Sequence, residues 1–147
     1  MAILNPLVTS VGAVVCTILI HAVVVTAIVD LFRMEKRGGH VGKSLWLDIA
    51  IVGRAVALAL VAHLIEMAVW AVLFVICGEF ADFGTAYYHS AVNYTTLGYG
   101  DVLMSASWKL LGPLEAANGM LLFGVTTAML FAIMQGLVKA RYADPRD

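Results

Sequence analysis

The chain has 147 residues, of which 62% are hydrophobic and 13% are charged, and its net charge is −1. Soluble domains are roughly half apolar and a quarter charged, so this composition excludes a water-soluble globule, and its high apolar content also excludes a disordered chain. The near-neutral charge provides no global basic field for binding nucleic acid. The composition therefore predicts an integral membrane protein.

Three apolar segments are each long enough to cross a bilayer, which takes about 20 residues. They run over residues 7–31, 45–77 and 110–138. We expect helices, because only helices and closed barrels satisfy the backbone in lipid, and the alternating pattern of barrel strands is absent. The predicted fold class is an all-α membrane protein with three transmembrane helices.

Basic residues follow the first and third apolar segments, whereas segment 78–109 is mostly acidic. The positive-inside rule then predicts a cytoplasmic loop at 33–44, a short cytoplasmic tail at 139–147, and an N-terminus outside. The second apolar segment contains Arg54 as its one basic residue, so the repeated Arg pattern of a voltage sensor is absent. The basic residues are Arg33, Lys36, Arg37, Lys43, Lys139, Arg141 and Arg146.

The segment between the second and third spans has an order of its own. Residues 85–94 form a semi-apolar run of about three helical turns, and Thr-Leu-Gly-Tyr-Gly-Asp follows at 96–101. A short helix and a Gly-x-Gly segment between two spans predict a re-entrant loop. Such backbone is tolerated at membrane depth only where it is buried in protein or lines water.

The residue types of this loop suit the binding of a dehydrated cation. Successive carbonyls point to one side only if some residues adopt left-handed conformations, which Gly98 and Gly100 allow without a Cβ penalty. Thr96 adds a hydroxyl oxygen, and Leu97 and Tyr99 are expected to pack behind the ion path. The negative C-terminal end of the preceding helix favours a cation below it.

Residues 96–101 resemble the selectivity filter of potassium channels, usually written T-V-G-Y-G-D. The resemblance extends over 45–138 and implies the bacterial two-transmembrane pore module: an outer helix at 45–77, a pore helix at 84–95, the filter at 96–101 and an inner helix at 110–138. Residues 1–32 are an extra N-terminal transmembrane helix beyond this module. Leu97 stands where Val is usual, so we expect altered packing there.

This resemblance implies a homotetramer in a bacterial plasma membrane that conducts K⁺ passively. The K⁺ sites would use Thr96, Leu97, Gly98 and Tyr99, with Gly100 completing the filter. No organic cofactor, nucleic-acid partner or enzymatic activity is expected. Two alternatives stay open: a weakly selective cation channel caused by Leu97, and a non-conducting accessory subunit of another channel.

The resemblance also assigns supporting residues at the outer mouth. Tyr88 falls at the position of an aromatic donor to Asp101, and Thr95 precedes the filter. Val92 stands where many relatives have a second carboxyl group, so we expect no shared-proton carboxyl pair. The alternative is that Tyr88 only packs at the membrane interface.

By the same resemblance, Gly119 lies near a glycine hinge of the inner helix, with Gly124 as the second choice. Either glycine would equally suit close helix packing. If Gly119 is the hinge, one face of this helix lines the pore, and Phe131 is a candidate hydrophobic constriction or packs between helices. That face consists of Phe123, Thr127, Phe131 and Gln135.

Three ionisable residues fall at one depth in the first two spans. With a rise of about 1.5 Å per residue, His21 and His63 are level, and Glu66 is one turn from His63. A carboxylate exposed to lipid there is costly, so we expect a polar contact of all three that pins the extra helix to the pore module and responds to pH. The alternative places Glu66 against the pore helix or a Thr of the third span. No motif around the three residues points to an enzyme.

Overall fold

The computed structural model describes residues 4–142, which form helices and no strand. The helices are α1 (Leu4–Arg37), α2 (Leu45–Ile76), α3 (Phe83–Tyr94) and α4 (Leu111–Tyr142). Of these, α1, α2 and α4 are long and apolar enough to cross a membrane. The fold is therefore the all-α membrane fold that the sequence predicts. The predicted tail beyond Tyr142, with Arg146, lies outside the described residues.

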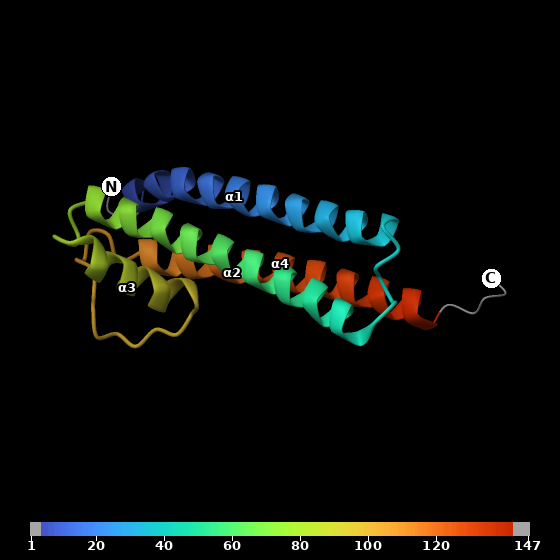
Figure 1. Cartoon of the computed structure of the whole chain (residues 1–147). Helices are drawn as coiled ribbons and strands as arrows, with labels where there is room; N and C mark the ends of the chain where they lie inside the picture. The colour runs from blue at the N-terminus through green and yellow to red at the C-terminus, as the bar shows by residue number, and fades with distance from the viewer. Residues whose placement is uncertain (1–3, 143–147) are drawn as a thin grey trace.

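The three long helices lie side by side, and the short α3 lies against one end of this bundle (Figure 1). Helix α1 packs on both α2 and α4, and α3 packs between the same two helices. The long loop from α3 to α4 lies at the same end of the molecule as α3 (Figure 1). The re-entrant segment is thus held by the two helices that flank it in sequence.

Two apolar cores hold the bundle together. The core near α3 centres on Trp70, Phe74, Tyr94 and Leu111, all of which are fully buried. The other core, at the opposite end, joins α1, α2 and α4. Small side chains on α2 let the neighbouring helices approach closely, which is the packing expected between helices in lipid. These are Ala55, Ala59, Ala62 and Ala71, all buried.

Two helices are longer than the apolar segments that predict them. Helix α1 continues through Arg37, past the end of its apolar segment at 31, and α4 continues to Tyr142, past 138. Residues 33–37 read Arg-Met-Glu-Lys-Arg, which are good helix formers, so the helix extends beyond its apolar run until Gly38 and Gly39 end it.

Candidate functional site

Helix α3 starts with a side-chain cap. The carboxylate of Asp82 accepts a hydrogen bond of 2.8 Å from the amide of Thr85, and this bond holds the pKa of Asp82 below its usual value. Farther along, the hydroxyl of Ser90 lies 2.8 Å from the carbonyl oxygen of Met67 on α2. The helix is therefore fixed at its start and along the face toward α2.

The backbone after α3 adopts left-handed conformations at every second residue. Gly98 has a φ of 61° and Gly100 a φ of 72°, in the region that sequence reasoning assigns to both. Thr96 also has a φ of 60°, which the sequence analysis missed because only glycines signal this region without cost. The left-handed conformations therefore begin two residues before Gly98, at Thr96, the first residue of the Thr-Leu-Gly-Tyr-Gly segment.

The hydrogen bonds of this segment fix the direction of two carbonyl groups. The amides of Leu97 and Gly98 both bond to the carbonyl of Val92, at 2.9 and 3.2 Å. In a trans peptide, the carbonyl of the preceding residue points opposite to the amide hydrogen, and the described residues contain no cis peptide. The carbonyls of Thr96 and Leu97 therefore point to the same side, away from α3.

The side chains of this segment are exposed in the single chain. Residues 95–101 are all exposed, with Leu97 at 55% and Tyr99 at 67% of their full accessible area. From the sequence, Leu97 and Tyr99 are expected to pack behind the ion path. In the single chain, α2, α3 and α4 leave both side chains uncovered.

The C-terminal end of the segment, at residues 101 and 102, is tied to α3 by two side chains. The hydroxyl of Tyr88 donates to a carboxylate oxygen of Asp101 at 2.7 Å, the pairing that the resemblance implies, and this bond raises the pKa of Tyr88. The neighbouring His89 binds the carbonyl oxygen of Val102 through Nδ1 at 3.0 Å. The structure therefore brings Tyr88 and Asp101 together and adds a histidine that the sequence analysis did not name.

His89 has a defined hydrogen-bonding role. Its Nδ1 faces a carbonyl and must donate, so its Nε2 accepts from the side-chain amide of Asn93 at 2.7 Å. Burial lowers the pKa of His89, which favours this neutral form. Nothing in the sequence marked His89, because its carbonyl partner at Val102 lies 13 residues away in a loop.

The loops on either side of α3 are joined as well. The carboxylate of Glu79 accepts from the amide of Ser105 at 2.6 Å and from its hydroxyl at 2.7 Å. This bidentate contact links the residues just after α2 to those just before α4. The two loops that flank α3 are therefore joined to each other.

On α4, the four predicted pore-lining residues are all exposed on the single chain. Thr127, Phe131 and Gln135 are therefore available to face an axis or a neighbouring helix, and Phe123 is 37% exposed. The ring of Phe123 also lies 4.2 Å from the ring of His63, measured between centroids, and contacts Tyr94. Phe123 is thus partly exposed and in contact with two rings inside the chain.

Gly119 lies where α4 meets the end of α3. A Cβ atom at this position would overlap the carbonyl oxygen of Tyr94, whereas a Cβ at Gly124 would have no neighbour within 4 Å. The helix runs without a break across both glycines. The sequence leaves two roles open for Gly119, a hinge or close helix packing. The contact with the Tyr94 carbonyl gives a direct reason for close packing in this conformation.

The structure brings His21, His63 and Glu66 together. Nδ1 of His21 lies 2.9 Å from one carboxylate oxygen of Glu66, and Nδ1 of His63 lies 3.1 Å from the other. All three side chains are at most 4% exposed. Tyr94 of α3 also donates to Glu66, and Thr126 of α4 completes the group. The alternative partners expected for Glu66, the pore helix and a Thr of the third span, thus belong to the same cluster.

A second buried carboxyl group escaped the sequence analysis. Glu115 of α4 is fully buried, and its Oε1 lies 2.5 Å from the hydroxyl of Ser90 on α3. Its other oxygen has no hydrogen-bond partner among the described residues. Glu115 thus links α3 to α4, as Ser90 links α3 to α2.

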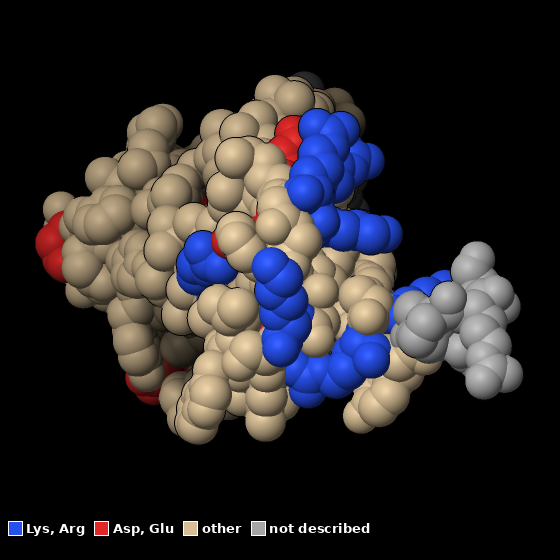
Figure 2. Space-filling model, turned by 45° about the vertical axis from the view of Figure 1, so that its right-hand side comes forward, with Lys and Arg blue, Asp and Glu red and all other residues tan. Residues whose placement is uncertain are grey.

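The opposite end of the bundle carries most of the basic residues. Figure 2 shows Lys and Arg side chains gathered on the end face formed by the α1–α2 turn and the end of α4. Two ion pairs join helices there: Arg54 to Glu35 at 2.7 Å, and Arg141 to Asp48 at 2.6 Å. Arg54, the one basic residue of the second apolar segment, is thus paired with α1.

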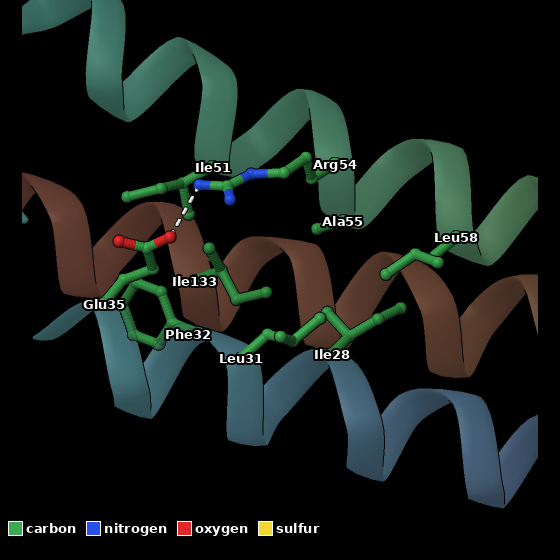
Figure 3. Close-up of a pocket in the computed structure, with 9 residues that line it drawn as sticks. All are labelled: Ile28, Leu31, Phe32, Glu35, Ile51, Arg54, Ala55, Leu58 and Ile133. Atoms are coloured by element: carbon green, nitrogen blue, oxygen red, sulfur yellow. Dashed lines mark hydrogen bonds and ion pairs between the residues drawn. The ribbon is translucent and has the colours of Figure 1, made fainter.

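The Arg54–Glu35 pair lies at the edge of a pocket between α1, α2 and α4 (Figure 3). Apart from this pair, the walls of the pocket are apolar, so it offers no set of converging polar groups for chemistry. Its lining residues are Ile28, Leu31, Phe32, Glu35, Ile51, Arg54, Ala55, Leu58 and Ile133.

A short helix and an irregular loop held between two membrane-crossing helices define a pore-loop membrane protein. A family model described as "Ion channel" matches residues 58–136, which is more than half of the chain. The chain therefore belongs to this family of ion channels with two transmembrane helices and a pore loop. The match covers most of α2, all of α3 and most of α4, and α1 lies outside it. Comparison with curated proteins and with solved structures found no match.

Proposed function

We propose that this ion channel is selective for potassium and conducts passively through a pore formed by four copies of the chain. The observation that carries this proposal is the shared direction of the Thr96 and Leu97 carbonyls, away from α3. Carbonyls in line replace the water of a dehydrated K⁺ ion, and rings of four such oxygens make the filters of known potassium channels.

The left-handed residues extend the same argument along the segment. In an ordinary extended strand, successive carbonyl groups point in alternating directions. The positive φ angles at Thr96, Gly98 and Gly100 interrupt this alternation three times. K⁺ ions then bind in a line between the carbonyls of Thr96, Leu97, Gly98 and Tyr99. The exposure of residues 95–101 supports the tetramer, because in lipid these backbone groups need partners from other chains.

The charge distribution supports an orientation in the membrane. The basic end formed by the α1–α2 turn and the end of α4 faces the cytoplasm under the positive-inside rule. The Thr-Leu-Gly-Tyr-Gly segment, at the other end, then lies toward the outside, in a plasma membrane.

Flux from liposomes that contain the purified protein tests the proposal. We expect K⁺ efflux far faster than Na⁺ efflux, and block by Ba²⁺, which has nearly the radius of K⁺ but twice its charge. Equal K⁺ and Na⁺ fluxes would instead indicate a weakly selective cation channel. Absence of flux from assembled protein would indicate an accessory subunit.

A glycine pair provides the matched control. Gly98→Ala should abolish selective flux, because the Cβ is strained at a φ of 61°. Gly12→Ala should leave flux unchanged, since Gly12 is helical and its added Cβ would meet no atom within 4 Å. Wild-type selectivity in Gly98→Ala would contradict the proposal.

A further inference from the structure

The buried cluster around Glu66 is a closed hydrogen-bonded ring built from all four helices. His21 comes from α1, His63 and Glu66 from α2, Tyr94 from α3 and Thr126 from α4. Both histidines turn Nδ1 toward the carboxylate of Glu66 and Nε2 toward the hydroxyl of Thr126. The Nε2 distances to Thr126 are 3.0 Å for His63 and 3.3 Å for His21.

Counting hydrogens shows that this ring is one proton short when its groups are in their ordinary forms. A neutral imidazole, a Tyr hydroxyl and a Thr hydroxyl have one hydrogen each, and an ionised carboxylate has none. Two neutral histidines, Tyr94 and Thr126 therefore supply four hydrogens.

The contacts need five hydrogens. Two lie between the histidines and the two oxygens of Glu66, two between the histidines and Thr126, and one between Tyr94 and Glu66. The remaining contact, from Nδ1 of His63 to the Tyr94 hydroxyl at 3.1 Å, shares the hydrogen that His63 gives to Glu66. With four hydrogens, one contact always joins two acceptors.

One added proton supplies the missing hydrogen of the ring and neutralises the negative charge of the cluster. In one arrangement His21 is an imidazolium that donates to Glu66 and Thr126, His63 donates to Glu66, and the Thr126 hydroxyl donates to His63. Moving the proton to Glu66 satisfies the same contacts. Either way the cluster has no net charge, whereas without the proton a negative charge is buried at the depth of the membrane, which is costly.

The groups that face the cluster do not supply a balancing charge. Within residues 4–142, the titratable groups that face it are His21 from α1, His63 and Glu66 from α2, and Tyr94 from α3, with Glu115 of α4 facing Tyr94. Glu115 is itself acidic and bonded to Ser90. No Lys or Arg is hydrogen-bonded to any of these groups in this part of the chain.

We propose that His21, His63 and Glu66 form a buried site that binds one exchangeable proton, and that this proton links the N-terminal helix to the conducting segment. The link is short, because Tyr94 is the last residue of α3 and Thr96 follows two positions later. Release of the proton at high pH breaks one contact of the ring and so loosens the hold of α1 on α2, α3 and α4. The binding of the proton stands on its own; its effect on conduction rests on the proposed function.

The proton is detectable without any measurement of flux. In bilayers at pH 7, nitrogen NMR of ¹⁵N-histidine protein should show one imidazolium in the cluster, or infrared spectra should show a protonated carboxyl group at Glu66. Glu66→Gln should remove this signal, because the amide brings its own hydrogens and no charge. A His40→Gln background removes the exposed histidine that binds Glu35.

Glu115→Gln is the matched control, because it removes the neighbouring buried carboxyl group and leaves the ring intact; the imidazolium signal should persist. The signal should also disappear reversibly as the pH is raised. Neutral histidines together with an ionised Glu66 at pH 7 would overturn the proposal. So would stoichiometric zinc on elemental analysis of the purified protein, since a metal ion would then occupy the place of the proton.

Flux adds a separate arm. The pH dependence of K⁺ flux in the alkaline range should be at least several-fold smaller in Glu66→Gln than in Glu115→Gln. Equal pH dependence in both variants would overturn the link to conduction. A protein that shows the proton signal and no K⁺ flux at any pH would contradict the proposed function and leave the proton site established.

Discussion

Single hydrogen bonds hold the chain at residues 101 and 102 against α3. Tyr88 and His89 are neighbours on α3, yet they bind different points of the returning chain: the Asp101 carboxylate and the Val102 carbonyl. Val92 is buried and apolar at the position where the resemblance implies a carboxyl group. Among the described residues, the side-chain hydrogen bond to the Asp101 carboxylate therefore comes from Tyr88.

Tyr88→Phe should weaken this restraint. The ring stays in place, but Asp101 loses its 2.7 Å hydrogen bond, so K⁺ flux should decline faster during sustained recording than in the wild type. Tyr87→Phe is the control, because the hydroxyl of Tyr87 binds the Leu64 carbonyl on α2 and not the mouth. Identical time courses in both variants would show that the bond to Asp101 does not hold the mouth.

His89 should make stability sensitive to mild acid. Burial lowers its pKa in the folded protein, so the unfolded chain takes up a proton first as the pH falls. The stabilising contribution of neutral His89 is therefore complete above about pH 6.5, the value for an unperturbed histidine, and decreases as the pH falls below it. Thermal unfolding midpoints between pH 8 and pH 5 should fall less in His89→Gln than in the wild type. Parallel slopes would argue against this role.

At the scale of elements, α3 is held in place by its contacts with α2 and α4. Ser90 bonds to the Met67 carbonyl and to Glu115, and Gly119 lets α4 approach the end of α3. These contacts are short because small residues lie at the crossing points, as is usual for helices packed in lipid. The position of the re-entrant segment thus depends on close packing more than on any loop.

Gly119→Ala should separate α4 from α3. The new Cβ overlaps the Tyr94 carbonyl, so the helices must move, at a cost of about 1–3 kcal/mol typical of overpacking. Thermal unfolding in detergent should show a lower midpoint for Gly119→Ala. Gly124→Ala should match or exceed the wild type, because its Cβ meets no neighbour and alanine favours helix. Equal midpoints for the two variants would show that the contact at Gly119 is not tight.

At the scale of the whole molecule, the single chain leaves the Thr-Leu-Gly-Tyr-Gly segment and part of α4 uncovered. Residues 95–101 are exposed, as are Thr127, Phe131 and Gln135. Elsewhere the helices are held together by two apolar cores and by ion pairs that join α1 to α2 and α2 to α4. The uncovered parts are those through which copies of the chain would meet.

Light scattering of the protein in detergent should give a protein mass of four copies of the 15.7 kDa chain. K⁺ should raise the thermal midpoint of this assembly more than Na⁺ at equal concentration, because an ion bound only by the assembled state stabilises it. A monomer that stays stable and monodisperse in K⁺ would contradict the tetramer.

The sequence by itself determined the membrane class, the three spans and the position of the re-entrant segment, because apolar length and the glycine spacing at 98 and 100 are local properties. It also placed His21 level with His63, since helical rise sets depth. Only the tertiary structure decided which way side chains turn about each helix axis. That rotation directs Phe123 onto His63, buries Glu115 beside Ser90 and brings Thr126 to both histidines. Helices in lipid are apolar on every side, so the sequence contains no amphipathic stripe from which this rotation could be read.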